Sequence, residues 1–109
     1  YLSALKYVDA VIGNSSSGLS ETPSFKIGAI NIGDRQKGRI RADNVIDCLP
    51  KKASIKNAFE MLYSKEFQSV IKNSDNPFGD GHSSKIMMKV LKTVKLTNVI
   101  KKSFYDLNF

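Results

Sequence analysis

The sequence is poor in the residues that build covalent and metal cross-links: it has one cysteine, Cys48, one histidine, His82, and no tryptophan. A single cysteine cannot form an internal disulfide, and one cysteine with one histidine cannot supply the clustered ligands of a metal site. Cys48 lies within the apolar run 45–49, so we expect a buried core thiol and not a catalytic one, which would need a base nearby. His82 follows a glycine at a helix entrance, and we expect it to cap the helix or face solvent.

Long apolar runs are also absent. No uninterrupted run reaches the length of a membrane span, and the N-terminus lacks the charged segment and apolar core of a signal peptide. We therefore expect a cytoplasmic location and no membrane partner. Hydrophobic residues make up 41% and charged residues 25% of the chain, which is typical of a globular and not a disordered protein.

Acidic residues are scarce: the chain has 17 Lys and Arg against 10 Asp and Glu, a formal net charge of +7 that favours an anionic partner. One basic group is Arg35, Lys37, Arg39 and Arg41; the other is a scatter of lysines between 85 and 102. We interpret the lysines as a solvated helix face. A nucleic-acid-binding domain is a distant alternative, because aromatic stacking platforms and nucleic-acid motifs are missing.

The chain has 109 residues, enough for one small domain with a core but few for a complete sugar- or nucleotide-processing enzyme. It starts at Tyr1 and not at Met, and Leu2, Leu5 and Val8 follow helical spacing from the outset. We therefore expect a piece of a longer protein.

The apolar pattern predicts an α/β fold with parallel strands. Strands are expected at 8–12, 29–33 and 44–48, and helices at 19–26, 53–63, 66–71 and from 83 onward, with a last helix carrying Val99, Ile100 and Phe104. Pro23 is tolerated early in the first helix, and Gly28 is expected to stop it. The apolar faces of the last two helices are expected to pack against a part of the protein outside this chain.

A polar run, Gly13-Asn14-Ser15-Ser16-Ser17-Gly18, joins the first strand to the first helix. Glycines let the backbone approach a phosphate, hydroxyls donate hydrogen bonds, and a following helix offers free N–H groups. The run lacks the lysine of a Walker loop and the spacing of a dinucleotide fingerprint. A plain helix-capping turn is therefore the alternative, since Ser and Asn are ordinary capping residues.

The Arg-rich loop 33–41 follows the second strand, so both loops leave the carboxyl ends of parallel strands. Ligands of open parallel sheets bind at that edge, and we expect the two loops to lie side by side there. Arg35 facing Ser15 and Ser16 would suit a diphosphate, because guanidinium groups bind phosphate oxygens in pairs.

The chain resembles the C-terminal part of hydrolysing bacterial UDP-N-acetylglucosamine 2-epimerases, the enzymes that supply N-acetylmannosamine for sialic acid synthesis. Four motifs in order carry the resemblance: 13–18, Glu21-Thr22-Pro23-Ser24-Phe25, 31–39 continued by Arg41-Ala42 and Asn44-Val45-Ile46, and Asn76-Pro77-Phe78-Gly79-Asp80-Gly81. The segment Arg35-Gln36-Lys37-Gly38-Arg39 is similar to the hydrolysing branch, whereas non-hydrolysing relatives carry a Thr-Glu-Arg-Pro-like stretch there. Thr22 stands where alanine is common.

The resemblance implies a glycosyltransferase-B-like enzyme with two Rossmann-like domains, in which residues 1–109 are most of the C-terminal UDP-binding domain and the N-terminal catalytic domain is absent. It also implies a UDP site with phosphates at the serine loop, the ribose at Glu21 and an arginine near the phosphates. The UDP-binding residues expected are Asn14, Ser15, Ser16, Gly18, Glu21 and Arg35. The alternative for Glu21 is an acid that only complements a helix dipole.

The family reaction that the resemblance implies is elimination of UDP from UDP-N-acetylglucosamine, followed by hydration to N-acetylmannosamine. No residue of this chain is assigned as catalytic acid or base, because those residues belong to upstream segments of the family. No cofactor is expected, and the complete enzyme is expected to be a homo-oligomer. Alternatives are an epimerase for a UDP-diacetamido-trideoxy sugar, a non-hydrolysing epimerase, and a UDP-sugar glycosyltransferase.

Overall fold

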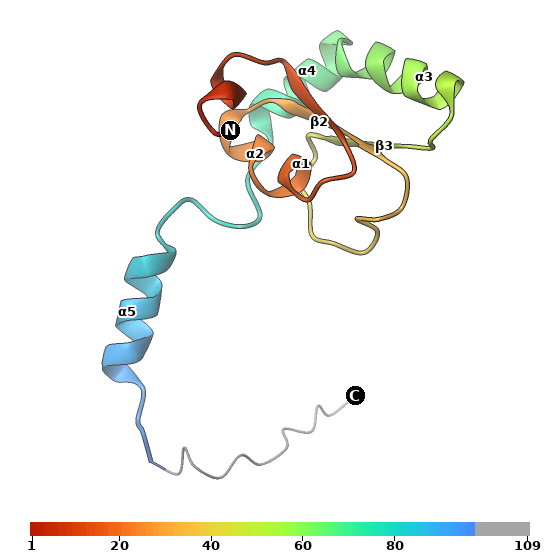
Figure 1. The fold of residues 1–109 in the computed structure, drawn as a ribbon. Helices are drawn as coiled ribbons and strands as arrows, with labels where there is room; N and C mark the ends of the chain where they lie inside the picture. The colour runs from red at the N-terminus through yellow and green to blue at the C-terminus, as the bar shows by residue number, and fades with distance from the viewer. Residues whose placement is uncertain (98–109) are drawn as a thin grey trace.

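Three parallel strands form the centre of the computed structural model, which describes residues 1–97 (Figure 1). They are β1 (Ala10–Gly13), β2 (Gly28–Ile32) and β3 (Val45–Cys48), and β2 lies between the other two. Ile30 of β2 pairs with Ile12 of β1 and Ile46 of β3. The carboxyl ends of all three strands therefore lie at one edge of the sheet, as the parallel pattern predicts.

Helices cover both faces of this sheet. Two short helices, α1 (Ser17–Ser20) and α2 (Thr22–Phe25), connect β1 to β2 and lie on one face, while α3 (Lys52–Leu62) and α4 (Lys65–Asn73) follow β3 and lie on the other (Figure 1). The main core is on the α3 and α4 side and consists of Ile30, Ile46, Cys48, Ala58, Leu62, Phe67 and Ile71. The expected Rossmann-like α/β class is confirmed.

Gly28 has a different role from the one expected. It lies inside β2, where an added Cβ would come within 2.3 Å of Leu62 Cδ1 and 3.2 Å of Ile71 Cδ1. The missing side chain is what lets α3 and α4 approach the sheet so closely. The stop of α2 is instead Lys26, which takes the left-handed conformation with φ 53°.

Other boundaries differ by a few residues. The helix expected at 19–26 is interrupted at Glu21 and forms two helices of one turn each. The helical spacing at the N-terminus yields only a short 3₁₀ helix, η1 (Ala4–Lys6), because Leu5 alone is buried while Leu2 and Val8 stay exposed. The helices expected at 53–63 and 66–71 are α3 and α4. Ser64 caps α4 by accepting a hydrogen bond from the Phe67 N–H.

The helix expected from residue 83 is α5 (Ser83–Thr93), which stands away from the sheet and its helices (Figure 1). None of its residues is buried. The last expected helix, with Val99, Ile100 and Phe104, lies outside the described residues. Through residue 97, no helix is both long and apolar enough to cross a membrane.

Candidate functional site

The loop 13–18 begins where β1 ends, at Gly13, and turns into α1. Ser15 acts partly as the capping alternative expected: its Oγ accepts a hydrogen bond from the Ser17 N–H at 3.3 Å. Ser16 occupies the N-cap position of α1 but makes no side-chain capping bond. Asn14, Ser15 and Ser16 are all exposed at the carboxyl edge of the sheet. The loop is therefore both a turn into a helix and a set of polar groups open to a ligand.

Gly18 is buried, unlike the rest of the loop. A Cβ added to it would lie 3.5 Å from Ala29 Cβ and 4.0 Å from Val11 Cγ1, which is ordinary van der Waals contact. The structure therefore places Gly18 against the sheet, beneath the exposed serines. Its place in the UDP site stays a prediction, with its contribution coming through the backbone of the turn.

Glu21 lies at the junction of α1 and α2. It follows the last residue of α1, and its carboxylate makes no capping hydrogen bond to α2. The side chain is half-buried, and its Oε2 atom is buried with no hydrogen-bond partner among the described residues. A buried carboxylate oxygen without a donor is uncommon in folded proteins. A ligand that donates hydrogen bonds, such as a ribose with its hydroxyls, would satisfy it.

Thr22 and Asn44 hold this junction against the sheet, and both are fully buried. The Thr22 hydroxyl donates to the Gly18 carbonyl at 2.7 Å, and the Asn44 amide donates to Thr22 Oγ1 at 2.9 Å and to the Ile27 carbonyl at 2.7 Å. The threonine that replaces the more common alanine thus has a hydrogen-bonding role that its position in the motif did not reveal. The network fixes the turn that carries Glu21.

The Arg-rich loop 33–41 lies beside the serine loop, as expected. Gln36, which is only 4% exposed, donates a hydrogen bond from its side-chain Nε2 to the Asn14 carbonyl at 2.7 Å. Gln36 was not among the expected site residues: it belongs to the motif that resembles the hydrolysing branch, but nothing in that motif indicates a contact with Asn14. The contact brings together two segments that are 22 residues apart.

The arginines of this loop point to different places. Arg35 is exposed and forms no ion pair within residues 1–97, so its place beside Ser15 and Ser16 stays a prediction. Arg39 instead lines a cavity of about 400 Å³ together with Ser16. We call it the Arg39 cavity, and its lining residues are Ser16, Leu19, Ser20, Arg39, Ile40 and Phe78. Sequence reasoning missed Arg39 because spacing alone does not separate it from Arg35.

Phe78 reaches the Arg39 cavity from the loop between α4 and α5. The neighbouring Asn76 holds this loop in place, since its amide donates to the Ser20 carbonyl at 3.1 Å and to Ser24 Oγ at 2.6 Å. The fourth motif of the sequence is therefore hydrogen-bonded to the end of α1, just beyond the first motif, and to the second motif. Its match in spacing was the one signal available for this contact.

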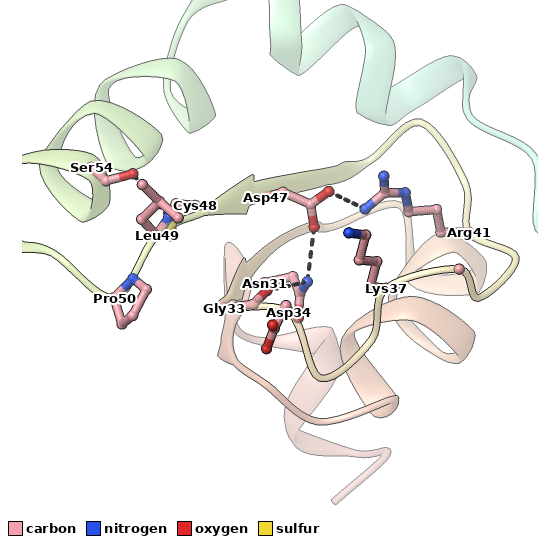
Figure 2. A pocket seen from close by; sticks show the side chains of 11 residues that line it. Asn31, Gly33, Asp34, Lys37, Arg41, Asp47, Cys48, Leu49, Pro50 and Ser54 are labelled. Carbon is pink, nitrogen blue, oxygen red and sulfur yellow. Dashed lines mark hydrogen bonds and ion pairs between the residues drawn. The ribbon is translucent and has the colours of Figure 1, made fainter.

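A second cavity, of about 610 Å³, lies at the carboxyl ends of β2 and β3 on another side of the same Arg-rich loop (Figure 2). There Asp47 accepts a hydrogen bond from Asn31 Nδ2 at 2.8 Å and pairs with Arg41, as the dashed lines of Figure 2 show. Lys37 lines this cavity and not the Arg39 cavity. The Asp47 contacts tie the end of the basic loop to β3.

Cys48 is buried at the end of β3, as expected. Burial, and to a smaller extent the neighbouring Asp47 carboxylate, raise the pKa of the Cys48 thiol above its ordinary value of 9.0. The thiol is therefore protonated at neutral pH, which argues against a nucleophile. Among residues 1–97, no three His, Cys, Asp or Glu side chains cluster as a metal site would require. His82 occupies the N-cap position of α5 but makes no side-chain capping bond; it is exposed, with its Nε2 atom 3.8 Å from Asp80 Oδ2.

Comparison with known proteins identifies the family. The model of the family described as UDP-N-acetylglucosamine 2-epimerase matches residues 1–92. This chain belongs to that family. The resemblance expected from the four motifs is therefore confirmed. The Rossmann-like sheet of this chain agrees with the glycosyltransferase-B-like fold class of the family.

Three curated relatives cover the chain almost completely. A GDP/UDP-N,N'-diacetylbacillosamine 2-epimerase (hydrolyzing) from Campylobacter jejuni is 50% identical over 98% of this chain and 28% of its own length. The polysialic acid biosynthesis protein P7 of Escherichia coli is 42% identical over the same shares. A UDP-N,N'-diacetylbacillosamine 2-epimerase (hydrolyzing) from Legionella pneumophila is 37% identical over 92% of this chain and 26% of its own length. The chain thus spans little more than a quarter of each relative.

Proposed function

We propose that this chain is the UDP-binding part of a hydrolysing UDP-sugar 2-epimerase. The observation that carries the proposal is the junction of two loops at the carboxyl edge of the sheet, fastened by the hydrogen bond from Gln36 to Asn14. Parallel α/β sheets bind nucleotides at this edge. The family match and the names of the two diacetylbacillosamine relatives support the same activity.

In this proposal the diphosphate lies over the exposed polar loop, with hydrogen bonds from Ser15, Ser16 and the backbone of Asn14. Gly18 belongs to the site through the turn, since its N–H donates to the Ser15 carbonyl at 3.3 Å. Arg35 supplies positive charge at the edge. The carboxylate of Glu21 accepts hydrogen bonds from the ribose hydroxyls. These hydroxyls supply the donor that the buried Oε2 atom lacks among the described residues. Every one of these groups binds UDP and none transfers a proton.

The chemistry proposed is a two-step conversion. A base removes the proton at C2 of the sugar while the C1–O bond to UDP breaks, which gives a glycal and UDP. Water then adds across the glycal double bond and yields the free sugar with inverted C2. This chain stabilises the negative charge that develops on departing UDP. The acid and base belong to the N-terminal domain, which we place in the part of the enzyme outside residues 1–109.

The sugar expected from the sequence was N-acetylglucosamine. The relatives from C. jejuni and L. pneumophila, named for diacetylbacillosamine, favour a UDP-diacetamido-trideoxy sugar as the substrate. UDP-N-acetylglucosamine stays the second candidate, favoured by the E. coli relative named for polysialic acid biosynthesis. Incubating the complete enzyme with each UDP-sugar, followed by analysis of the released sugar, tests this choice. Transfer of the sugar to an acceptor would support a glycosyltransferase instead.

The remaining partners are proposed on the same basis. The exposed apolar side chains of α5, among them Met87 and Leu91 at 62% and 69% exposure, suit a helix that packs against the N-terminal domain. We further propose a cytoplasmic homo-oligomer without a nucleic-acid partner. Sedimentation of the complete enzyme, and titration with duplex DNA at two salt concentrations, test these points.

A further inference from the structure

We propose that the Arg39 cavity is the subsite for the sugar of the UDP-sugar, and that Ile40 and Phe78 select sugars with apolar substituents. This inference rests on the proposed function and names the part of the site that reads the sugar. The cavity adjoins the serine loop through Ser16, and its volume of about 400 Å³ can hold one hexose.

The polar end of the cavity is suited to a phosphate. Arg39 forms no ion pair with any residue in the range 1–97, and the hydroxyl of Ser16 has no hydrogen-bond partner in that range. A guanidinium beside a free hydroxyl binds phosphate oxygens through charge-assisted hydrogen bonds. The Gln36 contact with Asn14 fixes the two loops that carry these groups. The phosphate next to the sugar therefore lies at the mouth of the cavity.

Apart from the Ser20 hydroxyl, which donates to the Ser16 carbonyl at 3.0 Å, the other walls of the cavity are apolar. Leu19 forms the floor with 2% exposure, while Ile40 and Phe78 are 66% and 51% exposed. Phe78 is held in position because Asn76 binds the turn at Ser20 and Ser24. Large apolar side chains that are exposed beside a phosphate site can pack against the apolar groups of the sugar attached to that phosphate.

The two candidate sugars differ in the groups that would meet these walls. A diacetamido-trideoxy sugar carries a methyl group at C6 and two acetamido methyl groups. N-acetylglucosamine carries a hydroxymethyl at C6 and one acetamido group. A wall of Leu19, Ile40 and Phe78 offers no hydrogen-bond partner for the C6 hydroxyl, so burying that hydroxyl there is unfavourable. The cavity therefore favours the trideoxy sugar.

The test uses the complete enzyme and the variant Ile40→Thr, which keeps the branched shape of the side chain and adds a hydroxyl. The ratio of kcat/KM for the UDP-diacetamido-trideoxy sugar to that for UDP-N-acetylglucosamine is measured in the variant and the wild type. We expect this ratio to fall about tenfold, the usual effect of one methyl-sized difference in an apolar pocket. UDP affinity should stay within twofold, because Ile40 does not touch the phosphates in this arrangement.

Two matched controls separate the subsite from general effects. Leu49→Thr changes a leucine of 59% exposure in the other cavity and should leave the ratio unchanged. Arg39→Ala should weaken UDP binding about tenfold, whereas Lys37→Ala, in the same basic loop but lining the other cavity, should not. Phe78→Tyr, which adds a hydroxyl to the same wall, provides a second variant if Ile40→Thr is poorly folded, and the same fall in the ratio is expected.

The outcomes are distinguishable. In one outcome the wild-type enzyme binds UDP and hydrolyses a UDP-sugar while Ile40→Thr keeps the wild-type ratio of kcat/KM, as Leu49→Thr does. In that case the assignment of the Arg39 cavity as the sugar subsite is wrong and the proposed function stands. Unfolding of Ile40→Thr together with an unchanged ratio in Phe78→Tyr would mean that the sugar does not meet these walls, which also overturns the inference. If the wild type neither binds UDP nor hydrolyses either sugar, the proposed function itself fails.

Discussion

Replacing Gln36 by Met tests whether the contact between the two loops serves binding. The change keeps the length of the side chain but removes the amide that donates to the Asn14 carbonyl at 2.7 Å. One neutral hydrogen bond contributes about 0.5–1.5 kcal/mol to stability. The wild-type Gln36 Oε1, however, is buried without a partner among the described residues, and its removal relieves a desolvation cost. The net loss of folding free energy should therefore be under about 1 kcal/mol.

UDP affinity should respond more strongly than stability does. Without the Gln36 contact, the loop that carries Arg35 and Arg39 is no longer held against Asn14, and ordering it on binding costs free energy. We expect calorimetric titration of the complete enzyme to show UDP binding weakened about tenfold, or about 1.4 kcal/mol, with the unfolding midpoint in denaturant nearly unchanged. Wild-type affinity in Gln36→Met would refute the reasoning. Gln68→Met, which removes a similar amide hydrogen bond from α4 to the Leu62 carbonyl at the end of α3, is the control.

Three further changes test the fold that carries the site. Gly28→Ala should lower the free energy of unfolding by about 1–3 kcal/mol in chemical denaturation, because the added methyl would lie 2.3 Å from Leu62 Cδ1; wild-type stability would contradict the packing described. Asn44→Ala should lower the free energy of unfolding by about 2–3 kcal/mol, because it leaves the buried Thr22 hydroxyl and the Ile27 carbonyl without their donor. A loss of under about 0.5 kcal/mol in the same measurement would argue against this hydrogen-bond network. Because the pKa of Cys48 is raised, the folded state holds the thiol proton more tightly than the unfolded state does. The contribution of Cys48 to the free energy of unfolding is therefore intact below pH 9.0 and declines above it. The stability difference between wild type and Cys48→Ala should therefore shrink between pH 8 and pH 10, and a constant difference would contradict the shift.

Much of the fold was predictable because its signals are local. Alternation and apolar runs place β1, β2 and β3 within two or three residues, and the parallel arrangement follows from the helical segments between and after them. That the two polar loops lie side by side also follows, because parallel strands end at a common edge.

The parts that escaped prediction depend on distant residues. Nothing near Gly28 in the sequence reveals that Leu62 and Ile71 close over it, so a glycine after a helix was taken for the helix stop. The interruption at Glu21 has a local cause in Pro23, which lacks the N–H that would continue α1, but the hydrogen bonds that fix the turn join Thr22 to Asn44, which is 22 residues away. These features are set by tertiary packing, which local propensity does not encode.

The same limit applies to the site. Ser15, Ser16 and Glu21 carry recognisable motif signals and lie at the expected edge. The choice between Arg35 and Arg39 depends on the path of the loop after Gly33 and Gly38, both of which take positive φ. Phe78 joins the cavity from a loop 62 residues beyond Ser16, which only the folded chain reveals.

The most direct test of the central claim is calorimetric titration of the complete enzyme with UDP, comparing wild type with Glu21→Ala and Arg35→Ala. We predict that wild type binds UDP and that each substitution weakens binding about tenfold or more, as loss of a charge-assisted contact does. Lys56→Ala, on the exposed side of α3, should bind as wild type does. Undiminished UDP binding in both Glu21→Ala and Arg35→Ala would contradict the placement of the nucleotide at these two loops.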